Sequence, residues 1–170
     1  MSNIQERPLT TEEKSEFETR ASQALKNLRA DDPEASPESI VQLVDAFVDK
    51  WQTGGFAPRK SLFGRKPALP DTVDVALGLG AVWGNQIVRK FGWEWTCLNQ
   101  DGQELYCVSS PNRGWVIYPT YFIKACLDNP KADCTVMLSF NMMAAGNIPE
   151  NPANSYENVM AGVHRVIPKR

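Results

Sequence analysis

The chain has 170 residues, of which 42% are hydrophobic and 9% aromatic, and its formal net charge at pH 7 is -2. A chain of this length fits one domain with a substantial core, and its apolar content is too high for global disorder. The near balance of charge argues against a dedicated nucleic-acid-binding protein, which normally carries a basic excess.

The N-terminal segment from Met1 to Arg7 lacks the apolar stretch of a secretory signal. No run approaches the roughly 18 apolar residues that a membrane span needs. We therefore expect a cytoplasmic protein without membrane association, with residues 1–9 disordered. The four cysteines contain no C-x-x-C pair and the chain has one histidine, so the sequence predicts reduced thiols, no metal and no cofactor.

Two amphipathic helices are predicted in the N-terminal third. Thr10 and Glu13 form a capping box at the start of the first helix. Its narrow apolar stripe consists of Phe17, Ala21, Leu25 and Leu28. Ser36 and Pro37 begin the second helix, which ends at Gly54-Gly55. Its broader stripe, typical of a core element, consists of Ile40, Leu43, Val44, Phe47, Val48 and Trp51.

Residues 56–70 are predicted to form a long loop rich in proline and cations, and loops of this length are usually functional or mobile. The candidate binding residues in it are Phe56, Arg59, Lys60, Phe63, Arg65 and Lys66. A solvated loop anchored by two aromatics fits the balanced charge of the chain best. The same residue types also suit the rim of a protein interface or, less well, a nucleic-acid backbone with stacked bases.

The longest predicted helix runs from Asp71 to Phe91 and is apolar around much of its circumference, which indicates a buried position. Its glycines, Gly78, Gly80 and Gly84, superficially suggest a dinucleotide-binding fingerprint. They fail that pattern, because three residues separate the last two and because they lie within a helix. We expect Gly80 and Gly84 to let a neighbouring element approach closely.

Alternation with a period of two predicts strands over residues 93–98 and 104–109, joined by a tight turn at Asp101-Gly102. In that register Trp93, Trp95 and Cys97 share a face with Tyr106 and Val108, opposite Cys107.

Further elements are predicted in the C-terminal third: a strand over residues 115–118, a short helix over 120–127, a fourth strand over 134–143 and a short helix around 159–163. The predicted fold is therefore a single α+β domain over residues 1–170. Its N-terminal helices and long buried helix pack on a small antiparallel sheet of three to four strands.

The segment over residues 77–129 carries four spaced motifs. These are Leu79-Gly80-x-x-x-Gly84, Gly92-Trp93-x-Trp95, Asp101-x-x-Glu104 and Tyr118-Pro119-x-x-x-Ile123. In this order they resemble a bacterial family of uncharacterised proteins, catalogued as a domain of unknown function. The resemblance implies an α+β fold with a small antiparallel sheet and brings no activity or catalytic residues. In general character the chain is also similar to bacterial immunity proteins, which bind and inhibit a toxin.

The expected function is non-enzymatic protein binding, in the specific form of an immunity-type inhibitor of a cognate toxin, since such proteins act by shape and charge complementarity. The alternative is a small-molecule-binding protein or enzyme with a pocket between the long helix and the sheet. That pocket would use His164 with Cys126 or Cys134 as its polar groups. Cysteines in apolar, regular segments are mostly inert, so no catalytic residue is predicted. Nucleic-acid binding by the loop is the third and least favoured hypothesis.

Overall fold

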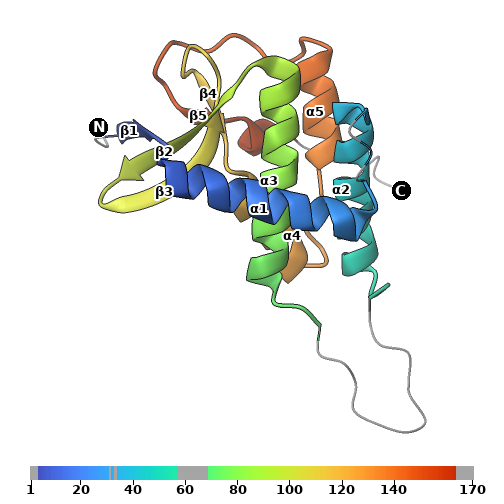
Figure 1. The fold of residues 1–170 in the computed structure, drawn as a ribbon. Helices are drawn as coiled ribbons and strands as arrows, with labels where there is room; N and C mark the ends of the chain where they lie inside the picture. Colours follow the sequence, from blue (N-terminus) through green and yellow to red (C-terminus); the bar gives the residue numbers. More distant parts are fainter. Residues whose placement is uncertain (1–3, 31, 33, 57–68, 164–170) are drawn as a thin grey trace, which may run out of the picture.

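The computed structural model describes residues 4–30, 32, 34–56 and 69–163, and these form an α+β fold (Figure 1). The helices are α1 (Thr11–Leu28), α2 (Pro37–Gln52), α3 (Thr72–Phe91), α4 (Pro119–Asp128) and α5 (Val136–Ala144). The strands are β1 (Ile4–Pro8), β2 (Glu94–Gln100), β3 (Gln103–Ser109), β4 (Trp115–Ile117) and β5 (Glu157–Asn158), followed by a 3₁₀ helix over Val159–Gly162. The predicted fold class is confirmed at this level. No helix in the described ranges is long and apolar enough to cross a membrane.

The first three helices begin where the sequence predicts. The Thr10 hydroxyl accepts a hydrogen bond from the Glu13 backbone N–H, and the Glu13 carboxylate accepts one from the Thr10 backbone N–H, which completes the capping box. Ser36 caps α2 and Asp71 caps α3 in the same way, through side-chain oxygens that accept backbone N–H groups. Local hydrogen bonding therefore sets these three helix starts.

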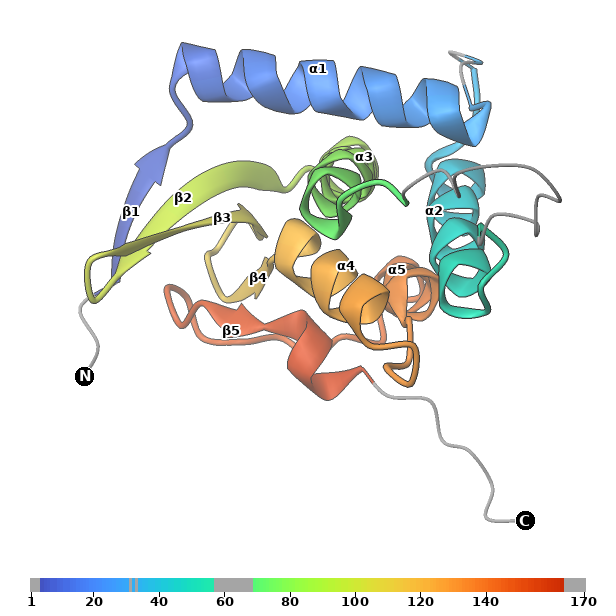
Figure 2. The same ribbon diagram turned by 90° about the horizontal axis from the view of Figure 1, so that it is seen from below.

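Helix α3 is the centre of the molecule. Figure 2 shows it nearly end-on, with α1 on one side and α4 on the other. Adding a Cβ at Gly80 would place that atom 2.7 Å from the backbone of Thr120 in α4. At Gly84 it would lie 2.1 Å from the ring of Trp95 in β2. The predicted close approach is confirmed, although the two glycines accommodate two different neighbours.

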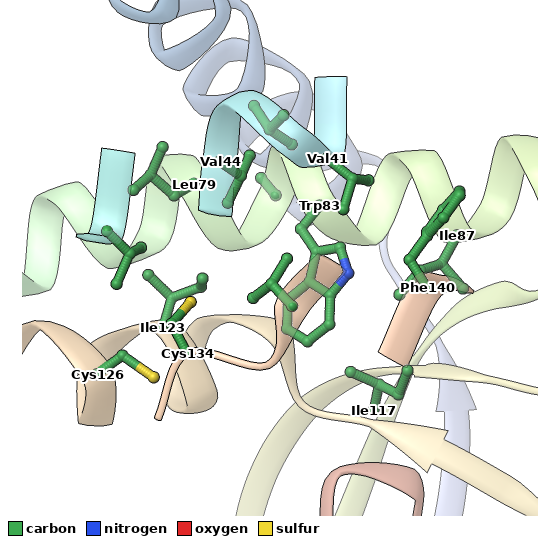
Figure 3. Close-up of a cluster of buried hydrophobic side chains, with 14 of the residues drawn as sticks. Val41, Val44, Leu79, Trp83, Ile87, Ile117, Ile123, Cys126, Cys134 and Phe140 are labelled. Carbon is green, nitrogen blue, oxygen red and sulfur yellow. The ribbon is translucent and has the colours of Figure 1, made fainter. Parts of the chain in front are cut away.

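The core lies between α2, α3, α4 and α5 (Figure 3). Trp83 of α3 and Phe140 of α5 are its largest fully buried side chains. Val41 and Val44 of α2 approach α3 from one side, and Ile123 of α4 approaches from the other (Figure 3). The helices thus bury most of the apolar surface, and the sheet closes one end of this core.

The sheet has five strands in the order β1-β2-β3-β4-β5, so it is larger than the three to four strands predicted. Its first three pairings are antiparallel, while β4 and β5 pair in parallel, so the sheet is mixed. The predicted hairpin is confirmed: Asp101 and Gly102 have φ angles of 53° and 85°, as a two-residue turn between antiparallel strands requires. Cys97 lies opposite Tyr106, so Cys107 faces the other side of the sheet, as expected.

The prediction of disorder over residues 1–9 is wrong for residues 4–9, because Ile4–Pro8 forms β1 against β2 and Leu9 is buried. The strand is polar, so alternating apolar residues give no signal for it. Ion pairs hold β1 in place instead. Arg7 forms an ion pair with Glu13. Glu6, whose side chain points to the opposite face of the sheet from Arg7, forms one with Arg113.

The predicted strand over residues 134–143 is also wrong, because Val136–Ala144 forms α5. Its buried residues, Val136, Ser139 and Phe140, are spaced three and four apart, as on one face of a helix. The alternation in this segment arose because Ser139 is polar yet buried, its hydroxyl donating to the Val136 carbonyl oxygen at 2.8 Å. Near the C-terminus, the side chain of Asn158 caps the 3₁₀ helix.

Candidate functional site

An apolar hollow of about 650 Å³ lies where α1, α2 and α3 meet, hereafter the helical groove. Its wall consists of Phe47, Trp51 and Phe56, its floor of Ala24, Gly78 and Leu79, and its rim of Arg20, Gln23, Asn27 and Asp74. Leu69 and Pro70, just before α3, complete its open side. The parts of α1, α2 and α3 that line the groove lie away from the sheet (Figure 2).

Three aromatic rings form the wall of the groove. Phe47 and Trp51 lie one turn apart on α2, with ring centroids 6.3 Å apart. The Phe56 ring lies 4.7 Å from Phe47 and 5.9 Å from Trp51. The Lys50 ammonium lies 4.7 Å from the Phe56 centroid, in cation–π contact. The rings support one another while each keeps part of its surface exposed.

Small residues on two facing helices form the floor. Gly78 of α3 faces Ala24 of α1 so closely that an added Cβ would lie 3.1 Å from the Ala24 Cβ. With no larger side chain at either position, the two helix backbones come together at the bottom of the groove. The space above them stays hollow, bounded by Leu79 and the aromatic wall.

The charged groups on the rim neutralise one another. The Arg20 guanidinium lies 3.5 Å from the Asp74 carboxylate and 2.9 Å from that of Glu16. The Gln23 side-chain amide donates to the Asn27 side-chain oxygen at 3.3 Å. Because the charges on the lining are paired and the wall is aromatic, the groove suits an apolar occupant.

Exposed apolar side chains lie in the groove at Leu69 and next to it at Leu43. Leu69 is 51% exposed, Val73 43% and Leu43 38%. Leu43 lies one turn before Phe47 on α2, whereas Val73 lies on the face of α3 opposite Val75 and Gly78, away from the groove. The apolar surface is therefore larger than the hollow itself.

The lining offers no obvious nucleophile. Of the described residues that bound the groove, none is a serine, threonine, cysteine or histidine. Elsewhere in the described ranges, no group of three or more His, Cys, Asp or Glu side chains could hold a metal ion. The chemistry that the groove supports is apolar binding.

The structure describes one of the six candidate binding residues from the predicted loop. Phe56 lies in the groove wall, packed on Phe47 and Trp51. The other five, Arg59, Lys60, Phe63, Arg65 and Lys66, lie outside the described residues.

The groove was missed because the sequence assigns the whole apolar stripe of α2 to the core. Val44 and Val48 are fully buried, but Leu43 is exposed and Phe47 and Trp51 are only partly buried. The width of the stripe was the available signal. With Val41 added to the predicted stripe, seven large apolar residues in 16 cover more of a helix than one packed face needs.

A second hollow, of about 570 Å³, lies between the end of α3 and β2, where the alternative hypothesis requires a pocket. Trp93 and Trp95 line it, whereas neither Cys126 nor Cys134 is among its described lining residues. His164 lies outside the described residues. The two cysteines instead lie next to each other in the core.

Comparison of the chain with models of known protein families, with curated proteins and with solved structures finds no match in any of the three. The resemblance carried by the motifs over residues 77–129 therefore stays a prediction. The function of this chain has to be argued from its own geometry, above all from the helical groove.

Proposed function

We propose that this chain is a non-enzymatic protein-binding protein that receives an amphipathic helix of another protein in its helical groove. The observation that carries the proposal is the continuity of the groove, whose lining includes the exposed Leu69, with the exposed side chain of Leu43 on α2. Contiguous exposed apolar surface with a polar rim is typical of interaction sites. Aromatic side chains such as Trp51 are also enriched among the residues that dominate binding energy.

The shape and charge of the groove favour a helix as the occupant. Grooves between helices bind amphipathic helices through side chains spaced three or four residues apart. The paired rim charges of Arg20 and Asp74 leave no need for a charged group on the buried face of the partner. A small molecule would fill the hollow but leave Leu43 exposed to water.

The lack of a nucleophile among the described lining residues supports binding rather than catalysis. The narrower proposal is that the partner is a toxin which the chain inhibits by covering its surface. The identity of the gene immediately upstream tests the toxin proposal. The proposal is supported if that gene encodes a toxin that arrests growth and if this chain, but not a groove variant, relieves the arrest. A housekeeping gene at that position contradicts it.

The groove itself can be tested with a display library of short helical peptides selected on the full chain. We expect enriched peptides to carry large apolar residues at helical spacing. Gln23→Arg, which places a charge on the rim, should weaken their binding at least about tenfold. Ser22→Arg, at the next and equally exposed position outside the groove, should leave the affinity unchanged.

Two results would overturn the proposal. One is the selection of peptides that bind Gln23→Arg as tightly as the parent chain. The other is that no helical peptide binds the chain, whereas a free fatty acid binds it and Gln23→Arg reduces the affinity for that fatty acid. The second result would assign the groove to a small apolar ligand.

A further inference from the structure

Cys126 and Cys134 are neighbours at the junction of α2, α4 and α5 (Figure 3). Cys126 lies in the last turn of α4, and Cys134 lies just before α5. The Cys134 thiol donates a hydrogen bond to Asp45 Oδ1 at 3.7 Å, and the Cys126 sulfur is also within its hydrogen-bonding reach. Both cysteines are thiols rather than a disulfide.

The surroundings make the two sulfur atoms chemically unequal. The hydrogen bond from Cys134 stabilises a thiolate at Cys126 and lowers the pKa of Cys126. That hydrogen bond, burial and the nearby carboxylate of Asp45 raise the pKa of Cys134. Cys126 is thus the better nucleophile, while Cys134 stays protonated beside it.

The connection that carries both cysteines is a polar turn at the surface of the molecule. The turn between them exposes the side chains of Asp128, Asn129 and Lys131. Hydrogen bonds from Gln52 of α2 hold the turn in place. Its Nε2 donates to the carbonyl oxygens of Cys126 at 2.8 Å and Ala132 at 2.9 Å, and to that of Asn129 at 3.3 Å. Opening of a polar turn of this kind would bring the buried sulfurs into contact with solvent.

We propose that Cys126 and Cys134 form a redox-active dithiol that a hydroperoxide oxidises to an intramolecular disulfide. The Cys126 thiolate attacks one peroxide oxygen; the O–O bond breaks, Cys126 becomes a sulfenic acid, and the leaving hydroxide takes a proton to form water. Cys134 then attacks the Cys126 sulfur. The S–O bond breaks as the S–S bond forms, and the Cys134 proton leaves with the hydroxide as a second water.

Two thiols and one hydrogen peroxide thus give one disulfide and two waters, with two electrons passing from the sulfurs to the peroxide. The other two cysteines provide an internal comparison. Cys97 and Cys107 lie on opposite faces of the sheet and cannot bond to each other. The proposal is independent of the helical groove.

The test exposes the native full chain to hydrogen peroxide at neutral pH, blocks remaining thiols with iodoacetamide and maps the cysteines by peptide mass spectrometry. We expect a linked peptide pair that contains Cys126 and Cys134, a loss of two hydrogen atoms from the chain, and reversal by a dithiol reductant. Persistence of both thiols, or oxidation of Cys126 without the link, overturns the proposal.

Variants separate the site from general oxidation. Cys97→Ser should leave the link unchanged, whereas Cys134→Ser should leave Cys126 as a sulfenic acid that dimedone traps. Gln52→Ala should speed formation of the link roughly tenfold, because the turn opens at lower cost. Gln42→Ala, at an exposed position on the same helix, should not. If Cys134→Ser does not fold, the peptide map of the parent chain still decides.

Discussion

The hydroxyl of Tyr106 donates a hydrogen bond to Glu13 Oε1 at 2.8 Å, which ties β3 to the first turn of α1. The same carboxylate accepts two hydrogen bonds from the Arg7 guanidinium at 2.8 Å and one from the Thr10 backbone N–H. One side chain therefore joins the N-terminal strand, the start of a helix and the middle of the sheet.

This arrangement predicts a pH dependence of stability. The Arg7 guanidinium, with the bonds from Thr10 and Tyr106, lowers the pKa of Glu13 from 4.5 to about 2. Because the folded-state pKa lies below the unfolded value, the contribution is fully present above pH 4.5 and is lost as the pH falls toward 2. Glu13→Gln should cost about 1–2 kcal/mol at neutral pH, since the site is partly exposed.

Urea unfolding of the parent chain and Glu13→Gln at several pH values measures this effect. The difference between the two should shrink across that acidic window. Glu12→Gln, at the neighbouring exposed position, should follow the parent curve. Parallel curves for the parent and Glu13→Gln would contradict the assignment.

The contact between Gly84 and Trp95 predicts overpacking. A Cβ at position 84 would force the Trp95 ring to move. The movement would disturb the hydrogen bond that Trp95 Nε1–H donates to the side-chain oxygen of Asn85 at 2.8 Å, and the contact of the ring with Phe17. Gly84→Ala should therefore cost about 1–3 kcal/mol, whereas the same change in an exposed helix stabilises by up to about 1 kcal/mol.

Gly84→Leu should lower the thermal midpoint by several degrees, and Ala46→Leu, at an exposed site on α2, should change it far less. A Trp95→Leu background gives a further control. There Gly84→Ala should cost much less, because the ring that it displaces has gone. An unchanged cost in that background would place the strain elsewhere.

The β2–β3 turn predicts a backbone effect. Gly102 has a φ angle of 85°, which L-residues other than glycine adopt only with strain. Gly102→Ala should destabilise the protein by about 1–2 kcal/mol in chemical unfolding. Gly162→Ala is the matched control, because no positive φ is recorded there and an added Cβ would meet nothing within 4 Å. Equal effects at the two sites would contradict this explanation.

The helical form of α5 predicts unequal roles for Phe140 and Met142. In a strand both would lie on one face, but in α5 Phe140 is fully buried beside Phe91 while Met142 is partly exposed. Phe140→Ala should cost about 3–5 kcal/mol. Met142→Ala should cost clearly less, and similar losses in urea unfolding would favour the strand.

Features that depend on neighbours in the sequence were predictable. The caps at Thr10, Ser36 and Asp71 each use a side chain that bonds to a backbone N–H two or three residues along the chain. The hairpin at Asp101-Gly102 likewise follows from local backbone preferences.

Features that depend on distant partners were not predictable. Strand β1 has little apolar character, and its position follows from ion pairs of Arg7 and Glu6 with residues far along the chain. The helical groove lies where Ala24 of α1 meets Gly78 of α3 beside Trp51 of α2, which brings together residues far apart in the sequence. The width of the α2 stripe indicates that the helix has apolar residues beyond one packed face, but it does not identify which of them stay partly exposed.

The pairing of β1 with β2 has a consequence for folding during synthesis. Ile4 pairs with Gln100, so β1 has no partner in the sheet until α1, α2, α3 and β2 have been synthesised. The Tyr156 hydroxyl, which donates to Glu6 Oε2 at 2.9 Å, arrives later still. Helices α1, α2 and α3 can form from local contacts while translation continues, whereas the sheet is complete only after β5 has been synthesised.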